Sequence, residues 1–372
     1  MKIKDITQKI EQLSPLSYAE GFDNVGLLVG NPEMSVNKVL ITLDTLESVV
    51  DEAIEKKCNL IVSFHPIIFS GLKSLTGQNY VERVVMKAIK NDIAIYSMHT
   101  ALDNMFLGVN SAICDALKLK NRAILIPQKH TIHKLVTYVP HKHSEMLRKA
   151  LFESGAGEIG NYSNCSFNLE GYGTFKGNDN SNPTIGEKNL LHTENETQIN
   201  VIFPKHLENK ILKALKENHP YEEIAYEIYV LENTHQHIGM GMIGELENPM
   251  DEQNFLNYLK NKMQTDCIRH SVLTGKKIKK VAVLGGSGAF AIDKAKAAKA
   301  DAFVSADFKY HDFFKAENQI LLTDIGHFES EQFTKMLLFD YLTKNFPNFA
   351  VVLSDVNTNP IKYITSKYDK ES

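Results

Sequence analysis

Short apolar segments alternate with helical patterns along most of this chain, and several of the apolar segments end in a histidine or an aspartate. The apolar segments lie at 39–43, 60–62, 93–96, 280–284, 302–304, 320–322 and 349–353, and the main helical patterns at 1–15, 46–57, 80–90, 292–299 and 332–344. Near-continuous apolar strands between helices are typical of a parallel sheet that is covered on both faces. The sequence therefore predicts an α/β fold, with a mostly parallel sheet sandwiched by helices and formed by the N- and C-terminal halves.

The pattern changes between residues 129 and 235. Two strand-then-helix units, at 134–154 and 198–218, flank a short strand pattern at 171–175, and another strand pattern follows at 226–231. This order predicts a ferredoxin-like α+β domain. A chain of 372 residues also suits two domains better than one. We therefore assign residues 1–128 and 236–372 to a metal-binding α/β domain and residues 129–235 to an inserted domain.

Composition excludes several classes of partner. The formal net charge is −4, and no basic, aromatic-rich stretch stands out, so we expect no nucleic acid. The first residues lack the apolar core of a signal peptide, and no run of about 18 apolar residues occurs, so we expect a cytoplasmic protein without a membrane partner. The four cysteines form no CxxC pair, which favours reduced thiols over a zinc knuckle.

Candidate ligands for a metal ion follow the predicted strands. His65 follows the segment 60–62, His99 and Asp103 follow 93–96, and His327 and Glu331 follow 320–322. Ligands collect beyond the carboxyl ends of parallel strands, and residues four apart on a helix share a face. Nitrogen and oxygen donors without thiolate suit Zn, Mn, Fe or Co and leave positions for water. A helix cap is the structural alternative for the last pair, but the joint pattern favours a metal site.

Other polar residues are open to two interpretations. Asp23 and Asn24 either form a turn or reach a site, and the loop chemistry favours the turn. Asp307 and His311, four residues apart, either line a pocket or begin a solvated helix. The glycine-rich segment 285–288 after a strand is either a tight turn or a contact for phosphate or substrate. It is not a Walker A loop, because no Gly-Lys-Ser/Thr follows.

Taken together, the segments 22–27, 63–66, 99–103, 284–288, 305–312 and 326–331 resemble the GTP cyclohydrolase 1 type 2 homologue family of dinuclear-metal proteins. The resemblance spans residues 1–128 and 236–372. The middle segment looks like the insert of the longer bacterial members, which is similar to PII and CutA domains. The resemblance implies an α/β core assembled into a toroidal homohexamer, with two metal ions per subunit facing a central cavity.

The family's ligands are two adjacent histidines before a proline, the aspartate of an H-T-x-L-D motif, and the histidine and glutamate of a G-H-x-x-x-E motif. By this resemblance the ligands here are His65, Asp103, His327 and Glu331. Phe64 stands where the first of the paired histidines belongs, and a phenyl ring donates nothing to a metal. We therefore expect one tighter ion held by His65, Asp103 and Glu331, and a weaker or empty second position near His327.

His99 or water is the candidate substitute for the donor that Phe64 removes. The open site and the resemblance predict a metal-dependent hydrolase that acts on a nucleotide or phosphoester-like small molecule. One or two divalent ions per subunit would serve it, zinc among the candidates. The alternative is a non-enzymatic metal- or effector-binding regulatory protein, which the insert and the lost ligand favour.

Overall fold

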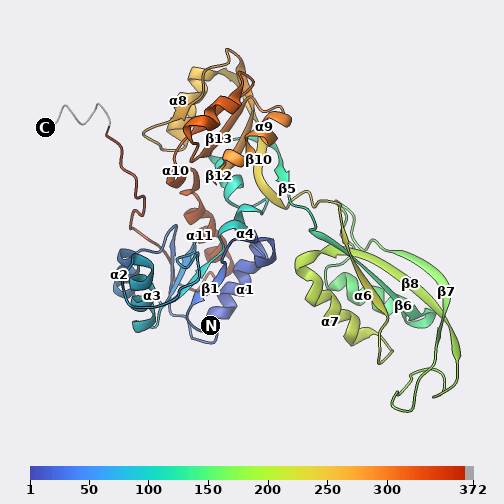
Figure 1. Ribbon diagram of the computed structural model, residues 1–372. Coiled ribbons are helices and arrows are strands. Elements are labelled where there is room, and N and C mark those ends of the chain that lie inside the picture. Colours follow the sequence, from blue (N-terminus) through green and yellow to red (C-terminus); the bar gives the residue numbers. More distant parts are fainter. Residues whose placement is uncertain (365–372) are drawn as a thin grey trace. The chain divides into compact units, whose positions relative to one another are not determined.

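The computed structural model describes residues 1–364 and divides the chain into two compact units (Figure 1). The main unit combines residues 1–127 with the chain from residue 236 onward, and the inserted unit contains residues 128–235. Each unit is described by itself. Within residues 1–364, no helix is long and apolar enough to cross a membrane.

The first sheet of the main unit has five strands in the order β1-β4-β3-β2-β15. Its strands are β1 (Gly26–Val29), β2 (Val39–Thr42), β3 (Leu60–Ser63), β4 (Ala94–Ser97) and β15 (Val351–Leu353). All neighbours are parallel except β1, which is antiparallel to β4. The helices with this sheet are α1 (Ile3–Leu13), α2 (Glu47–Glu55), α3 (Tyr80–Lys90) and α11 (Thr334–Asn345).

Alternating side chains of these strands fill two cores, one on each face of the sheet. Val39 and Ile41 of β2 pack with apolar residues of α1 and α11, whereas Leu40 between them packs with those of α2 and α3. Successive side chains of a strand point to opposite faces, so a strand that is apolar throughout requires cover on both sides. The sheet is therefore sandwiched by helices, as the apolar strands predict.

The second sheet of the main unit has six strands in the order β11-β14-β13-β12-β10-β5. Its strands are β5 (Lys120–Pro127), β10 (Gly239–Asp251), β11 (Arg269–His270), β12 (Lys277–Ser287), β13 (Ala302–Ala306) and β14 (Leu321–Asp324). The three strands β12, β13 and β14 are parallel, and the others pair antiparallel. The helices of this part are α4 (His99–Asp103), α5 (Val109–Ala116), α8 (Glu252–Lys262), α9 (Ile292–Ala297) and α10 (His327–Glu331).

The predicted α/β class is confirmed, but the main unit contains two sheets where the pattern suggested one. The halves of the chain exchange strands, because β15 from the C-terminal half joins the first sheet and β5 from the N-terminal half joins the second. The sequence pattern did not identify β5, β10, α5 or α8. Strand β5 begins with three polar residues, and α8 carries polar residues at more than half of its positions, so neither stands out as an apolar segment.

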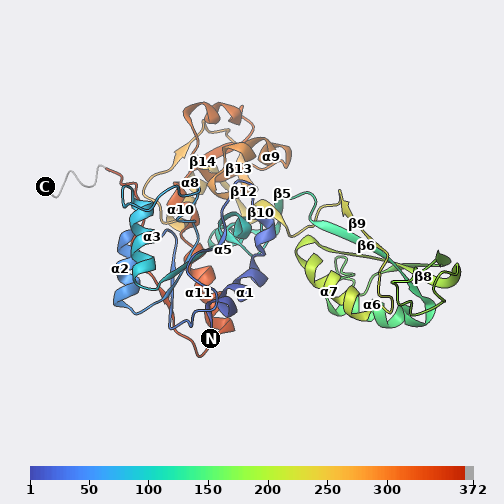
Figure 2. The ribbon, with the colours of Figure 1, turned by 60° about the horizontal axis from the view of Figure 1, so that its bottom comes forward.

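The inserted unit has four antiparallel strands in the order β7-β8-β6-β9 (Figure 2). Its elements are β6 (Ile132–Pro140), α6 (Ser144–Glu153), β7 (Phe167–Phe175), β8 (His192–Pro204), α7 (Glu208–Asn218) and β9 (Tyr226–Leu231). This β-α-β-β-α-β order with that strand arrangement is ferredoxin-like. Leu135 of β6 and Ile199 of β8 pack against Leu151 of α6 and Ile211 of α7 in one core. Both helices therefore cover the same face of the sheet.

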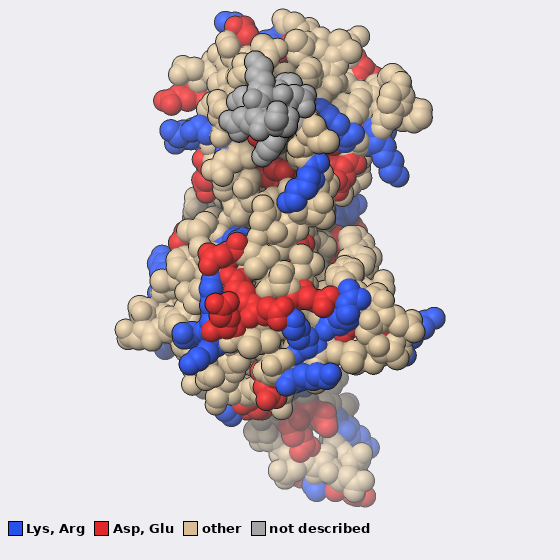
Figure 3. All heavy atoms as spheres, turned by 90° about the vertical axis from the view of Figure 1, so that its left-hand side faces the viewer, with Lys and Arg blue, Asp and Glu red and all other residues tan. Residues whose placement is uncertain are grey.

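Charges of both signs are mixed on the face of the main unit that Figure 3 presents. Acidic side chains gather in the part of that view where α2 and α3 lie, and basic side chains stand among them. Glu47 of α2 pairs with Arg83 of α3 at 2.7 Å, and Asp51 pairs with Lys87. These cross-helix pairs account for part of the mixed pattern.

Candidate metal centre

His65 lies just beyond strand β3 and is held by a carboxylate from the neighbouring strand end. Its ring Nδ1 donates a hydrogen bond to Oδ1 of Asp44, at 2.8 Å, and its backbone N–H donates to the carbonyl of Leu43. The other oxygen of Asp44 accepts a hydrogen bond from the Thr358 hydroxyl at 2.5 Å. These contacts fix the ring and leave Nε2 to face Oε2 of Glu331 at 3.1 Å.

His327 and Glu331 occupy the first and last positions of helix α10, just beyond strand β14. Nδ1 of His327 donates to Oδ2 of Asp307 at 2.7 Å, and Nε2 of His327 lies 3.2 Å from Oε2 of Glu331. The two side chains thus share one helix face, one turn apart, as their spacing predicts. Asp307 extends from the end of the parallel neighbour β13, so both histidines are held by a carboxylate from an adjacent strand end.

The ligand atoms of His65, His327 and Glu331 all lie within 4.8 Å of one another, and we call these three residues the donor cluster. The carboxylate of Glu331 is the buried centre, with 3% of its side chain exposed. Burial alone would lower the pKa of both imidazoles, but the hydrogen bonds to their carboxylate partners raise it, to about 10 for His65 and about 11 for His327. Burial opposes ionisation of Glu331, yet the two imidazoles lower its pKa to about 2.

A glycine makes room for the central carboxylate. Gly286 of strand β12 has a φ of +69°, and a Cβ at this position would lie 2.5 Å from Oε1 of Glu331. The backbone N–H groups of Gly285 and Gly286 donate to the side chains of Asn110 and Ser330. These two amides are therefore not free to bind phosphate, and both residues belong to a strand rather than a tight turn. The segment still lines a cavity through Gly285, Gly286 and Ser287, so its interpretation as a substrate contact stays a prediction.

Asp103 and His99 extend the cluster from helix α4. Oδ1 of Asp103 is buried, and no donor within residues 1–364 bonds to it. Burial, and then the nearby charge of Glu331, raise the pKa of Asp103 well above its ordinary value. Nδ1 of His99 lies 2.8 Å from Oδ1 of Asp23, and its ring centroid lies 5.2 Å from that of His65. His99 also has a φ of +23°, an unusual backbone conformation for a non-glycine residue that is often found at functional sites.

Phe64 is fully buried and offers no metal donor. Its ring centroid lies 4.9 Å from that of His65 and 5.6 Å from that of His99, so it packs between the two imidazoles and the core of the first sheet. The structure brings together His65, His327 and Glu331, whereas the sequence analysis placed Asp103 rather than His327 beside His65 and Glu331. The difference arises because helix α10 points Nε2 of His327 directly at the shared carboxylate.

A cavity of about 260 Å³ is lined by two members of the donor cluster, His327 and Glu331. Phe22 and Phe290 are its exposed aromatic residues, with 66% and 60% of their surface accessible. His99 and Asp103 line it beside His327 and Glu331. A small molecule in this cavity would therefore meet apolar rings as well as the imidazole and carboxylate donors.

Two candidates from the sequence, Asn24 and His311, are not among the residues of the donor cluster or of the cavity lining. The side-chain amide of Asn24 donates to the carbonyl of Ile68 at 2.5 Å, which is a loop contact. The exposed ring of His311 packs beside Tyr310 and Phe314 in the 3-10 helix η5 (Tyr310–Ala316). Neither residue joins the donor atoms that the structure groups together.

Sequence reasoning missed the roles of two aspartates. Asp44 is not among the candidates from the sequence, and the loop chemistry around Asp23 favours a turn, yet each aspartate holds a histidine by a 2.8 Å hydrogen bond. Asp23 also accepts hydrogen bonds from Thr100, and the bonds from His99 and Thr100 lower its pKa to about 2 despite burial. The sequence does contain an indication for Asp44. It follows strand β2, which is parallel to β3, the strand that precedes His65.

The residues present fit a divalent cation. Both histidines donate from Nδ1 to a carboxylate, which is the common arrangement around histidine ligands of metals, and both Nε2 atoms face one buried oxygen. Without a metal, each Nε2 needs a proton to bond to that oxygen, and a divalent cation would supply the same positive charge. Oδ1 of Asp103, to which no group within residues 1–364 donates, is a further buried carboxyl oxygen that a cation could bind.

The fold and this cluster define a class: an α/β protein in which the ends of two sheets present imidazole and carboxylate donors that could hold a metal ion. The chain belongs to the Duf34/NIF3 (NGG1p interacting factor 3) family, whose model matches residues 1–360. The family resemblance read from the sequence is thereby confirmed.

Relatives match the chain over nearly its whole length. A GTP cyclohydrolase 1 type 2 homolog of Bacillus subtilis is 38% identical over 370 residues, covering 97% of this chain and 98% of the relative. A homolog of that name in Staphylococcus aureus is 35% identical, covering 98% of this chain and all of the relative. The crystal structure of a Bacillus cereus protein related to NIF3 has a TM-score of 0.85 at 36% identity, covering 98% of this chain and 99% of that chain.

Proposed function

We propose that this protein is a metal-dependent hydrolase that acts on a nucleotide or another phosphoester-like small molecule. The observation that carries the proposal is the convergence of His65, His327 and Glu331 on one point, beside a cavity of about 260 Å³ that His327 and Glu331 line. The name of the relatives, GTP cyclohydrolase 1 type 2 homolog, supports a nucleotide as the first substrate to test. Cytoplasmic location, with no nucleic-acid or membrane partner, is part of the same proposal.

A bound divalent ion, with Zn, Mn, Fe and Co as candidates, would supply Lewis-acid chemistry and lower the pKa of a bound water. The residues of the chain provide the rest. Asp44 and Asp307 orient the two imidazoles, and the buried Glu331 holds its charge between them. Phe22 and Phe290 give a flat apolar substrate two rings to contact at the cavity.

We propose one tight ion at the donor cluster and a weaker second position that uses Asp103 and His99. Nδ1 of His99 is committed to Asp23, as Nδ1 of His65 is to Asp44, so in both rings Nε2 is the nitrogen left for a ligand. His99 therefore stands in for the donor that Phe64 does not provide. Metal analysis that finds two equally tight equivalents per chain after dialysis would contradict this assignment.

We also propose that the chains assemble as a toroidal homohexamer, as the family resemblance implies. Light scattering should then give about six times the 41.9 kDa mass of one chain. A monomer or dimer at micromolar concentration would refute this part of the proposal.

The hydrolase is tested by measuring turnover of GTP and of nucleotide phosphoesters with the Zn, Mn, Fe and Co forms. We expect turnover in at least one form, and its loss in His65→Ala and Glu331→Gln. His311→Ala is the matched control, because this histidine is exposed and outside the donor cluster. If every metal form is inert and His65→Ala changes only the metal content, the hydrolase proposal fails.

The second candidate is a non-enzymatic effector-binding regulatory protein. The observation in its favour is a cavity of about 690 Å³ in the inserted unit, which lies among residues that have no part in the donor cluster. Inert metal forms, together with specific binding of a small molecule to the inserted unit, would favour this function over the hydrolase.

A further inference from the structure

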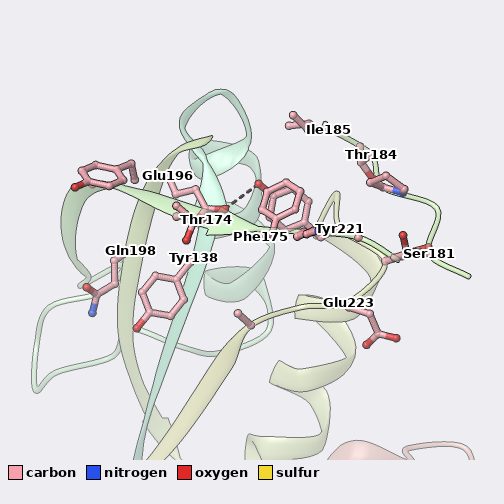
Figure 4. Close-up of a pocket in the computed structure, with 18 of the residues that line it drawn as sticks. Tyr138, Thr174, Phe175, Ser181, Thr184, Ile185, Glu196, Gln198, Tyr221 and Glu223 are labelled. Carbon is pink, nitrogen blue, oxygen red and sulfur yellow. Dashed lines mark hydrogen bonds between the residues drawn. The ribbon is translucent and has the colours of Figure 1, made fainter. Parts of the chain in front are cut away.

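The inserted unit contains a cavity of about 690 Å³ on the helix-free side of its sheet (Figure 4). Leu135, Ile199 and Val201 point toward α6 and α7, so the alternate residues of the same strands point to the other face. Tyr138 of β6 and Gln198 of β8 are directly paired on that face and line the cavity. The segments 176–185 and 221–225 form its other walls.

One buried carboxylate lies in this cavity. Glu196 of β8 is 9% exposed, and its Oε1 accepts a hydrogen bond from the hydroxyl of Tyr221 at 2.8 Å. A Cβ at position 173 would lie 2.2 Å from Oε2 of Glu196, so the glycine in strand β7 makes room for this side chain. Nothing lies within 4 Å of the Cβ that would be added at Gly171, which leaves open space beside the carboxylate.

Aromatic rings surround that space. Phe175 and Tyr221 have ring centroids 5.8 Å apart with planes tilted by 60°, and Tyr138 and Tyr172 also line the cavity. Figure 4 shows Tyr221 directed at Glu196, with Phe175 beside it and Tyr138 nearby. Aromatic faces carry negative charge density and attract cations, more strongly when water is excluded.

The charged side chains of the lining favour a positively charged ligand. Four glutamates and a single lysine line the cavity: Glu170, Glu196, Glu222, Glu223 and Lys176. This lining repels phosphate groups, so a nucleotide does not fit it. A metal ion is also a poor fit, because within residues 1–364 the one group of donors close enough to share a metal is the cluster in the main unit.

We propose that this cavity binds an organic ammonium cation with an apolar body. The buried carboxylate of Glu196 would pair with the positive charge, and the rings of Tyr138, Phe175 and Tyr221 would contact the alkyl or aryl body. The volume is within the usual range for small-molecule sites. The inference does not depend on the hydrolase, because no residue of the donor cluster takes part.

The test is calorimetric titration of the full-length protein with benzyltrimethylammonium and with spermidine, using GTP as an anionic counter-probe. We expect at least one of the two cations to bind with one site per chain. Glu196→Gln keeps the shape of the side chain and the bond from Tyr221 but removes the negative charge. The affinity of this variant for the cation should therefore be roughly tenfold lower than that of the wild type. A Cβ at position 171 meets no atom within 4 Å, so Gly171→Leu should fill the open space and abolish cation binding.

Glu153→Gln is the matched control, since it removes one exposed glutamate on helix α6 of the same unit and should bind like the wild type. Circular dichroism establishes that each variant is folded. The proposal is overturned if neither cation binds at millimolar concentration, or if Gly171→Leu binds as the wild type does. It is also overturned if GTP binding, rather than cation binding, is lost in Gly171→Leu. A wild type that binds no cation, with a Gly171→Leu variant of altered oligomeric state, would identify the cavity as a contact between copies.

Discussion

In the main unit, the imidazoles of His65 and His327 each lie between two carboxylates, whereas in the inserted unit the imidazole of His219 lies between two backbone groups. The first arrangement raises the pKa values of the rings to about 10 and about 11, although burial opposes this. In the second, burial lowers the pKa of His219, and its bond to the carbonyl of Tyr138 only partly compensates. All three imidazoles are at least partly removed from water, so the hydrogen-bond partners decide which charge state the fold favours.

The same contrast separates the two cavities. In the main unit the acids Asp44, Asp307 and Glu331 all bond to imidazoles, which directs nitrogen and oxygen donors at one point. In the inserted unit Glu196 accepts a hydrogen bond from a tyrosine hydroxyl, and the rest of the lining around it includes several aromatic rings. A single buried carboxylate there stands beside an apolar wall. Converging nitrogen and oxygen donors suit a small divalent metal ion, and a carboxylate among aromatic rings suits a large organic cation.

The largest expected effect concerns the centre of the donor cluster. Glu331→Gln removes the charge that both Nε2 atoms face, so metal affinity should fall by at least about 100-fold, more than for loss of an outer partner. Titration with Zn and Mn, followed by metal analysis after dialysis, measures this change. Glu317→Gln, an exposed glutamate of the same unit, should bind metal like the wild type. If the metal affinity of Glu331→Gln is unchanged, the carboxylate of Glu331 is not a metal ligand.

A smaller effect is expected from the outer aspartates. Asp44→Asn and Asp307→Asn keep the shape but weaken the hold on His65 and His327, so each should lower metal affinity by about 10- to 100-fold. The same titration checks this result, with Asp340→Asn at an exposed position as the control. Equal affinity in all three variants would mean that the histidines keep their orientation without these bonds.

The sequence predicted what depends on local pattern. The apolar strands, the position of His65 beyond β3 and the helical spacing of His327 and Glu331 all follow from residues near one another in the chain. What it could not predict depends on pairing between distant segments. Asp23 and His99 are 76 residues apart in the sequence, and Asp44 and Thr358 are 314 residues apart. No local spacing reveals either contact.

Phe64 offers a test of the family resemblance and a third prediction. Phe64→His restores the paired histidines before Pro66, so a second metal equivalent per chain should survive dialysis that removes it from the wild type. The new imidazole would lie in a fully buried position, and folding stability should fall by roughly 1–3 kcal/mol. Metal analysis and chemical denaturation measure the two effects, with Phe167→His, at an exposed ring of the inserted unit, as the control. A variant that retains no additional metal would show that position 64 does not face the site.

The smallest expected effect tests the neutral histidine of the inserted unit. Nε2–H of His219 donates to the carbonyl of Tyr138, and Nδ1 accepts the backbone N–H of Tyr221, so protonation at Nδ1 removes that acceptor. Because the folded pKa is lowered, the stabilisation is complete above the unfolded pKa of about 6.5 and is lost as pH falls through the folded value.

Hydrogen exchange at the amide of Tyr221, corrected for the intrinsic pH dependence, should therefore show protection that falls between pH 7.5 and pH 5. The neighbouring charges act in both directions on His219, since Glu196 raises its pKa and His143 lowers it. Glu196→Gln should consequently move the loss of protection to lower pH, while the amide of Val201 in the core of the same sheet serves as the internal control. If protection at Tyr221 stays constant over this range, Nδ1 of His219 remains unprotonated and keeps accepting the Tyr221 amide. The contrast between the histidines of the two units would then not extend to their protonation.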